Sequence, residues 1–154
     1  MIVVFIRHGK AEPKTEEKPD KERELTEEGR KDLETLARIL PITPKKIYTS
    51  PYKRAIQTAE IIADAWKIPI EVREELSPEN MSIESIRKLE LSGGEILVGH
   101  APSIEDVVSK LMGGGKVDMS SGSAACLEIE EMKEGGGTLL FLVSRSVIRK
   151  IREK

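Results

Sequence analysis

The chain has 154 residues, 38% of them apolar, which is enough for one domain with a hydrophobic core. A formal net charge of −2 and an aromatic content of only 3% argue against a nucleic-acid partner, because nucleic-acid binders need a basic surface and rings on which bases stack. The sequence shows no signal-peptide pattern and no apolar run long enough to span a membrane, so we expect a cytoplasmic protein without a membrane partner. The single cysteine, Cys126, lies in an alternating apolar stretch and is predicted to be a buried thiol.

The first half of the chain alternates extended and helical patterns. Residues 2–6 form a continuous apolar, β-branched run, which predicts a strand buried on both faces. A polar stretch with two prolines at 10–24 predicts a solvated loop. From Thr26 to Leu40, a capping threonine and two acidic residues precede leucines at helical spacing, which predicts a helix. Residues 46–49 predict a second strand, and Pro51 the first position of a second helix.

The second half continues this alternation and ends in two successive strands. Its predicted elements are an extended piece at 69–72, a helix at 82–91, a buried strand at 95–98, a helix at 102–112, strands at 124–130 and 138–143, and a basic tail at 147–154 that is frayed or helical. Glycines at 135–137 separate the last two strands, which therefore form a hairpin. The pattern predicts an α/β fold over residues 1–154, a single domain with a mainly parallel central sheet flanked by helices and an antiparallel C-terminal hairpin strand.

Both histidines of the sequence follow predicted strands. Arg7-His8-Gly9 comes directly after the first strand, and His100 follows the strand at 95–98 with one glycine between them. In open α/β sheets, ligands bind beyond the carboxyl ends of the strands. We therefore expect His8 and His100 to belong to one ligand site rather than to be solvated loop residues.

A charged segment also follows the second predicted strand. In Ser50-Pro51-Tyr52-Lys53-Arg54-Ala55, the guanidinium of Arg54 falls in the first turn of the predicted helix, near its positive end. Phosphate binds well at such an end, and arginine adds a planar pair of donors. Taken alone, Arg54 is better interpreted as a solvated surface residue; the two histidines make it a candidate phosphate ligand.

Together these segments resemble the histidine phosphatase superfamily, also called the phosphoglycerate mutase-like family. Four motifs occur in the family's order, namely Arg7-His8-Gly9, Leu25-Thr26-Glu27-Glu28-Gly29, Ser50-Pro51-x-x-Arg54-Ala55-x-x-Thr58 and Gly99-His100. Within this family the chain is most similar to the short SixA-type phosphohistidine phosphatases, through the stretches at 7–12, 75–78 and 121–125.

The resemblance implies a phosphatase that works through a phosphohistidine intermediate. His8 is then the catalytic nucleophile, and Arg7, Arg54 and His100 complete the catalytic phosphate pocket, with the backbone amide of Ala101 as an extra phosphate-binding donor. Neutral imidazole attacks a dianionic phosphoryl group without charge repulsion, and neighbouring guanidiniums keep it unprotonated. This scheme requires no metal and no cofactor, and the sequence offers no strong metal-ligand spacing.

The substrate is less narrowly indicated than the reaction. Ester-cleaving members of the family protonate the leaving oxygen with a carboxylic acid, for which Glu74, Glu75 and Glu79 are the candidates here, although a solvated acidic loop is the favoured interpretation of all three. The absence of a convincing acid motif and of a segment long enough for an elaborate lid favours a phosphohistidine on a protein as substrate. The alternatives are a phosphatase of small phosphorylated metabolites and a non-catalytic phosphate-recognition module, while a mutase fits less well.

Overall fold

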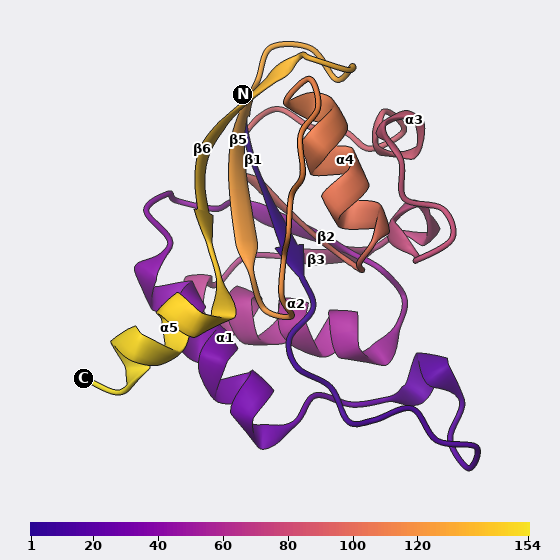
Figure 1. The fold of residues 1–154 in the computed structure, drawn as a ribbon, viewed down its shortest axis with the longest axis vertical. Coiled ribbons are helices and arrows are strands. Elements are labelled where there is room, and N and C mark those ends of the chain that lie inside the picture. The colour runs from indigo at the N-terminus through magenta and orange to yellow at the C-terminus, as the bar shows by residue number, and fades with distance from the viewer.

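A computed structural model describes residues 1–154, in which six strands form one sheet with helices on both faces (Figure 1). The strands, in chain order, are β1 (Ile2–Arg7), β2 (Lys46–Thr49), β3 (Ile70–Val72), β4 (Glu95–Gly99), β5 (Ala124–Ile129) and β6 (Gly137–Val143). Their order across the sheet is β3-β2-β4-β1-β5-β6. Strands β1 to β4 run parallel to one another. Strand β5 pairs antiparallel with β1, and β6 pairs antiparallel with β5, which confirms the predicted sheet and its C-terminal hairpin.

The helices divide between the two faces of the sheet. One face is covered by α1 (Glu27–Ile39), α2 (Lys53–Trp66) and α5 (Arg145–Arg152), and the other by α3 (Ile83–Ile86) and α4 (Ser103–Leu111). Two 3-10 turns, η1 (Asp20–Glu22) and η2 (Glu74–Leu76), interrupt the connections. None of these helices combines the length and the apolar character that crossing a membrane requires.

The central strand β1 divides the core into two layers. Val3 and Phe5 pack on the side of α3 and α4, whereas Val4 and Ile6 pack on the side of α1 and α2, and all four side chains are fully buried. Burial of each such side chain contributes roughly 1.5–3 kcal/mol to stability. Cys126 is fully buried in the second layer, as predicted. The end of β1 is therefore a firmly anchored point from which the next residues project.

The C-terminal tail, which the sequence left between frayed and helical, is the helix α5. Ile148 is fully buried against the side of the sheet that α1 covers. Arg149 and Arg152 of α5 both approach Asp32 of α1, at 3.3 Å in each case. A buried apolar anchor and paired charges thus hold the tail in place.

Two predicted helices need correction. The helix predicted at 82–91 is wrong in length, because α geometry covers only Ile83–Ile86; Ser82 caps it as expected, but Lys88 and Leu89 donate to residues three positions back, as in a tight 3-10 turn. The helix predicted to start at Pro51 begins at Lys53. The Ser50 amide continues the strand pattern by donating to Val98, and the Ser50 hydroxyl accepts from the Tyr52 amide, which delays the helix.

Candidate active site

Three neighbouring parallel strands deliver the candidate residues to one edge of the sheet. In the strand register, Arg7 at the end of β1 pairs with Gly99 of β4, and Thr49 of β2 pairs with Val98 of β4. The segments that follow these strands therefore emerge side by side, as the strand-end rule predicts. They surround a cavity of about 350 Å³, which is lined by Arg7, His8, Ala11, Asp20, Arg23, Tyr52, Arg54, Pro78, His100, Ala101 and Ser121. All five residues singled out from the sequence are in this set.

His8 is held with one ring nitrogen turned toward a donor and the other fixed by the backbone. Its Nδ1 lies 2.8 Å from the Gly9 carbonyl oxygen, which can only accept, so Nδ1 carries the proton and Nε2 keeps its lone pair. Arg54 Nε donates to that Nε2 across 3.2 Å. The pKa of His8 is lowered to about 3, mainly by burial and further by Arg54 and Arg7, against the raising effect of the Gly9 carbonyl. The imidazole is neutral near pH 7, which is the nucleophilic form.

Two glycines and a threonine from the sequence motifs let neighbouring backbone segments pack closely around His8. The Gly9 amide donates to Thr58 Oγ1 at 3.0 Å, and the same hydroxyl donates to the Arg54 carbonyl at 2.8 Å, so α2 is tied to the end of β1. A Cβ at Gly9 would lie 2.7 Å from Leu33 Cδ1, and a Cβ at Gly29 would lie 2.3 Å from the Lys10 carbonyl oxygen. These glycines permit the close approach of α1 to the site.

Arg54 and Arg7 bring two guanidiniums to the cavity, the first on a buried residue and the second on a half-buried one. Arg54 is 5% exposed and lies in the first turn of α2; besides His8, its Nη1 donates to the Asp20 carbonyl at 2.8 Å. Arg7 Nη1 donates to the Met119 carbonyl at 2.8 Å, while its buried Nε has no partner within the chain. Burial lowers the pKa of both groups, although arginine stays charged at any physiological pH. Both are therefore permanent cations beside the His8 ring.

His100 faces His8 from the end of β4. The two ring centroids are 5.0 Å apart with an angle of 57° between the planes, and the Tyr52 ring packs edge-on against His100 at 4.9 Å. His100 Nε2 lies 2.8 Å from Ser50 Oγ, whose hydroxyl can donate to it and so leave the ring proton on Nδ1. This Nδ1 is buried and has no partner. Burial lowers the pKa of His100 to about 2, with contributions from His8 and Arg54, so this ring is also neutral.

Unpartnered donors mark the cavity as an anion site. Arg7 Nε and His100 Nδ1 are buried without partners, and the Ala101 amide donates no hydrogen bond within the chain. Leaving a buried polar group without a partner costs about 1–3 kcal/mol, so an anion that offers acceptors is stabilised here. The Ala101 amide precedes α4, which begins at Ser103 rather than at the expected Pro102.

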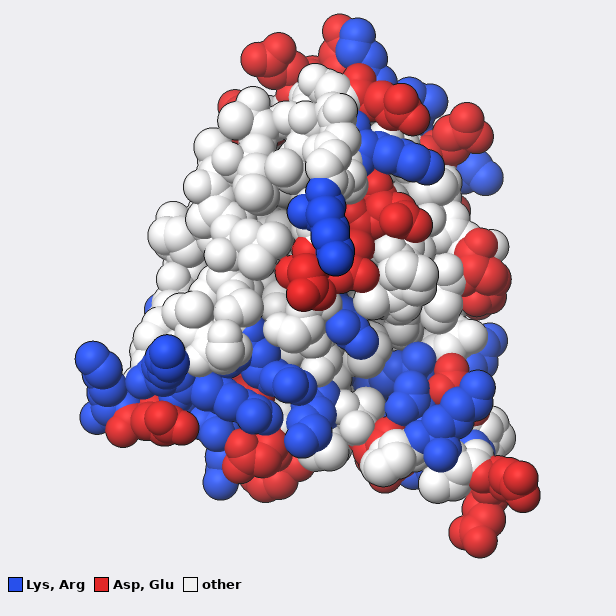
Figure 2. Space-filling view, viewed as in Figure 1, with Lys and Arg blue, Asp and Glu red and all other residues white.

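The basic surface of α5 adjoins the cavity. Figure 2 shows Lys and Arg side chains gathered at the lower left, over α5, whereas the surface over β6 is uncharged. Arg145 at the start of α5 donates to Ser121 Oγ at 2.9 Å, and Ser121 lines the cavity. Such a surface raises the local concentration of anions near the site.

The loop at 10–24, predicted to be solvated, is folded against the site and contributes two lining residues that the sequence patterns do not mark. Asp20 accepts from Arg54 through its carbonyl at 2.8 Å and through Oδ2 at 3.4 Å, and Arg23 Nε donates to Asp20 Oδ1 at 2.8 Å. Arg23 also donates to the Glu12 carbonyl at 2.8 Å. Burial by itself raises the pKa of the Asp20 carboxyl, but Arg54 and Arg23 outweigh it and hold that pKa below its usual value.

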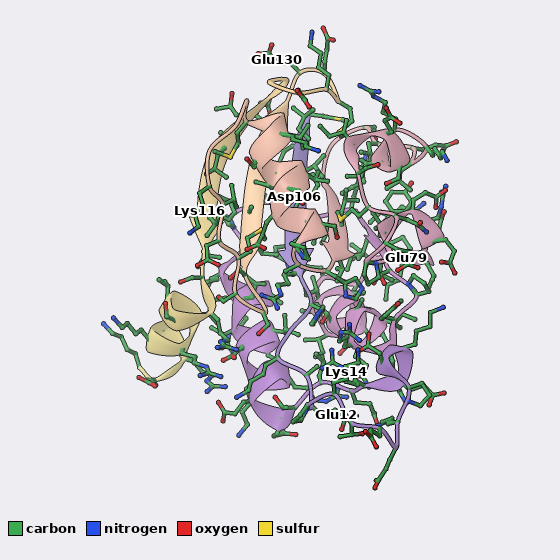
Figure 3. All side chains as sticks on the ribbon, turned by 45° about the vertical axis from the view of Figure 1, so that its right-hand side comes forward. Glu12, Lys14, Glu79, Asp106, Lys116 and Glu130 are labelled. Atoms are coloured by element: carbon green, nitrogen blue, oxygen red, sulfur yellow. The ribbon has the colours of Figure 1, made fainter.

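The three glutamates considered as leaving-group acids do not line the cavity. Glu75 is bound by Arg73, whose Nε lies 3.0 Å from Oε1, and Glu74 and Glu75 border a separate depression beside Lys88. Glu79 is exposed on the segment after η2; Figure 3 shows it apart from Glu12 and Lys14 of the 10–24 loop. The carboxylate that the structure does place in the cavity is Asp20. No three His, Cys, Asp or Glu side chains cluster closely enough to hold a metal ion.

The fold and the site define an α/β protein in which two neutral histidines and three arginines line one cavity at the carboxyl edge of the sheet. Residues 3–82, about half of the chain, match the model of the histidine phosphatase superfamily (branch 1). The chain belongs to this superfamily of phosphatases, as the sequence motifs indicate. No curated protein matches the sequence significantly.

Solved structures share the fold over nearly the whole chain. The protein histidine phosphatase SixA, complexed with tungstate, is 23% identical with a TM-score of 0.77, over 95% of this chain and 98% of its own. The phosphoserine phosphatase of Entamoeba histolytica, bound to 3-phosphoglyceric acid, is 18% identical with a TM-score of 0.69, over 93% and 96%. A mycobacterial glucosyl-3-phosphoglycerate phosphatase in complex with VO3 is 16% identical with a TM-score of 0.72, over 93% and 99%. These similarities establish the phosphoglycerate mutase-like fold.

Proposed function

We propose that residues 1–154 form a single histidine phosphatase domain that removes phosphoryl groups from phosphohistidine on proteins, with His8 as the nucleophile. The observation that carries this proposal is the state of His8. Its Nδ1–H is fixed by the Gly9 carbonyl, its Nε2 keeps a lone pair, and its pKa is lowered to about 3. A histidine in this state is ready to attack phosphorus without prior loss of a proton.

In the first half-reaction, the His8 Nε2 lone pair attacks phosphorus and the bond from phosphorus to the substrate nitrogen breaks. The electron pair of that bond stays on the substrate imidazole, which leaves. Arg7 and Arg54 stabilise the charge on the equatorial oxygens, while His100 and the Ala101 amide donate to the same group. The products are dephosphorylated substrate and His8 phosphorylated on Nε2.

In the second half-reaction, water attacks the phosphoryl group on His8. The bond between phosphorus and Nε2 breaks, the electron pair returns to Nε2, and both water protons leave with the phosphate. The Nδ1–H of His8, held by the Gly9 carbonyl at 2.8 Å, stays in place throughout, so the ring is restored to its starting form. Hydrolysis of phosphorylated His8 in this scheme needs no separate base.

Two features support a phosphohistidine on a protein rather than a small ester as the substrate. First, the loop at 10–24 and the Pro78 segment border the cavity without closing over it, so a side chain on another protein can reach His8. Second, the one carboxylate of the cavity is ionised by its arginine partners and has no proton to give to a leaving oxygen. A similar solved structure is the protein histidine phosphatase SixA.

A small-molecule phosphomonoesterase is the second candidate function. It is supported by the likeness to the phosphoserine and glucosyl-3-phosphoglycerate phosphatases, which share the fold at comparable identity. A phosphate-recognition module without turnover is a weaker alternative, because the nucleophile and its cationic neighbours are all present in the cavity.

The test is a substrate panel with the wild type and His8→Ala side by side. We expect kcat/KM to be highest for a phosphohistidine-bearing protein, lower for p-nitrophenyl phosphate and sugar phosphates, and lost in His8→Ala. Rapid quenching without acid should trap a labelled phosphoryl group on the wild type only. Faster turnover of sugar phosphates would contradict the proposed substrate but not the role of His8 as nucleophile. If the wild type showed neither label nor turnover, the recognition module would be favoured.

A further inference from the structure

Asp20 occupies a position in the cavity that the reaction described above does not use. It is the only Asp or Glu among the eleven residues that line the cavity. Its side chain is 34% exposed, so it remains accessible to a ligand. Two guanidiniums keep it ionised, that of Arg23 paired with Oδ1 and that of Arg54 with Oδ2. A carboxylate in this state is an acceptor only, and a pocket built for phosphate has no evident need of a second anion.

Arg54 joins this carboxylate to the attacking atom. The Nε of Arg54 lies 3.2 Å from His8 Nε2, and its Nη2 lies 3.4 Å from Asp20 Oδ2. The guanidinium therefore spans the interval between nucleophile and carboxylate, and a PO3 unit held by Arg54 lies in the same region. The contact to Oδ2 is long, and a carboxylate offers about four lone-pair sites, so Asp20 can accept a further hydrogen bond.

Breaking a P–N bond places a specific demand on the leaving imidazole. A phosphorylated imidazole leaves as a neutral ring only if its other nitrogen carries a proton; otherwise it must leave as an imidazolate anion. Protonation of that nitrogen makes the ring cationic before the bond breaks, and an anionic acceptor nearby favours the cationic form. Phosphate esters have no such N–H and gain nothing from an ionised carboxylate.

We propose that Asp20 accepts a hydrogen bond from the free ring N–H of the substrate phosphohistidine and thereby selects P–N substrates over phosphate esters. This inference rests on the proposed function and names the residue that would make the enzyme prefer phosphohistidine to phosphate esters. As His8 Nε2 attacks, the P–N electron pair passes to the phosphorylated nitrogen of the substrate, and the other nitrogen keeps its proton in the hydrogen bond to Asp20. The imidazole leaves neutral, and no proton is transferred.

The surroundings of Asp20 allow its effect on pH dependence to be isolated. The charged and ionisable groups that face it are Arg23 on its own segment, Arg54 and Tyr52 at the start of α2, and His100 after β4. The pKa of His100 is about 2, chiefly through burial, and burial raises that of Tyr52. Both shifts move the titration of His100 and of Tyr52 away from the interval between about pH 5 and about pH 9. If the pH profile of kcat/KM on phosphohistidine bends in that range, the bend therefore reports protonation of the substrate's imidazole ring.

The experiment compares Asp20→Asn and Asp20→Glu with wild type on a phosphohistidine-bearing protein and on p-nitrophenyl phosphate, from about pH 5 to about pH 9. Asp64→Asn, which removes an exposed carboxylate of α2, is the matched control. We expect Asp20→Asn to lower kcat/KM on phosphohistidine by about 10-fold or more, the effect of one hydrogen bond to a charged group, and to move its alkaline limb to lower pH. Turnover of p-nitrophenyl phosphate should fall by a smaller factor, because the ester has no ring N–H for Asp20 to accept. The ratio of the two kcat/KM values should therefore drop in Asp20→Asn, and Asp20→Glu should recover part of it.

Each outcome separates the possible roles of Asp20. An equal fall on both substrates would overturn the inference and leave Asp20 as an anchor of the 10–24 loop on Arg54. No change on either substrate would overturn it as well. If the wild type itself fails to prefer phosphohistidine, the proposed substrate is wrong; if that preference exists and survives in Asp20→Asn, only the role of Asp20 is wrong.

Discussion

Two clusters of buried charge in this protein are built in opposite ways. Between α1 and α5, Asp32 is 1% exposed on its side chain and meets two arginines, Arg149 and Arg152, at 3.3 Å each. At the carboxyl edge of the sheet, three guanidiniums and one carboxylate line the cavity together with two neutral imidazoles. The first cluster surrounds a buried carboxylate with two partly exposed arginine side chains. The second places its cations around a cavity.

The difference shows which cluster holds the fold together and which is kept ready for a ligand. The α1–α5 cluster has its ion-pair partners within the chain and fastens the C-terminal helix, although Asp32 Oδ1 has only the ion pair with Arg152 at 3.3 Å and no hydrogen bond. The cavity has two more positive than negative side chains, which a dianionic phosphoryl group would neutralise, and it keeps buried donors of Arg7 and His100 unpartnered. Charge that is incompletely compensated in the folded protein is typical of functional sites. Variants in the two clusters should therefore affect different properties.

Among the variants that compare the two clusters, the largest effect is expected for Arg54→Ala. If Arg54 binds the phosphoryl oxygens as proposed, loss of its guanidinium should lower kcat by about 10²- to 10³-fold, as for other donors that stabilise developing charge. Inhibition by orthovanadate should weaken in parallel, and steady-state kinetics on p-nitrophenyl phosphate measure both effects. The control is Arg38→Ala, which removes an exposed arginine of α1. A kcat for Arg54→Ala within a few fold of wild type would contradict the assigned phosphate pocket.

The second effect concerns the α1–α5 cluster and should appear in stability alone. Asp32→Ala leaves Arg149 and Arg152 without their buried partner and should lower the free energy of unfolding by about 1–3 kcal/mol, below the cost of breaking a fully buried pair because both arginines are partly solvated. Urea denaturation measures this, with Asp64→Asn as the exposed control. Activity on p-nitrophenyl phosphate should be unchanged; a loss of turnover with normal stability would mean that the two clusters are coupled.

The positions of the site residues were largely predictable from the sequence, because they depend on short-range patterns. The β-branched run before Arg7 and the buried strand before His100 identify parallel strands, and parallel strands end at one edge of a sheet. Arg54 follows from the same logic, since its helix begins two residues later than expected but still places the guanidinium in the first turn.

Asp20 and the short α3 could not be predicted because long-range contacts determine them. Asp20 meets Arg54 across 34 positions of sequence, and the 10–24 segment by itself shows only mixed charges around two prolines. Ile83 and Ile86 of α3 and Leu89 after it have helical spacing, and all three are buried although the chain tightens into a 3-10 turn after Ile86. A helical period therefore identified the face but not the length of the element.

The last effect, which distinguishes the two clusters by its dependence on pH, comes from the histidines. The pKa of His8 is lowered to about 3 and that of His100 to about 2, both mainly by burial, against 6.5 for an unperturbed histidine. Below about pH 6.5 these histidines are protonated in the unfolded chain but not in the folded protein. The free energy of unfolding should therefore fall as the pH is lowered from there toward 3.

Denaturant titrations between about pH 7 and about pH 4.5 test this prediction, because carboxylates contribute little in the upper part of that range. In His8→Gln and His100→Gln the slope with pH should be shallower than in wild type, whereas in Asp32→Ala the slope between about pH 7 and about pH 5.5 should be unchanged. Saturating phosphate should raise the stability of the wild type near pH 7, since an anion that binds only the folded protein favours it. Equal slopes in wild type and both histidine variants would show that the imidazoles are not held neutral, and would remove the main reason for assigning His8 as the nucleophile.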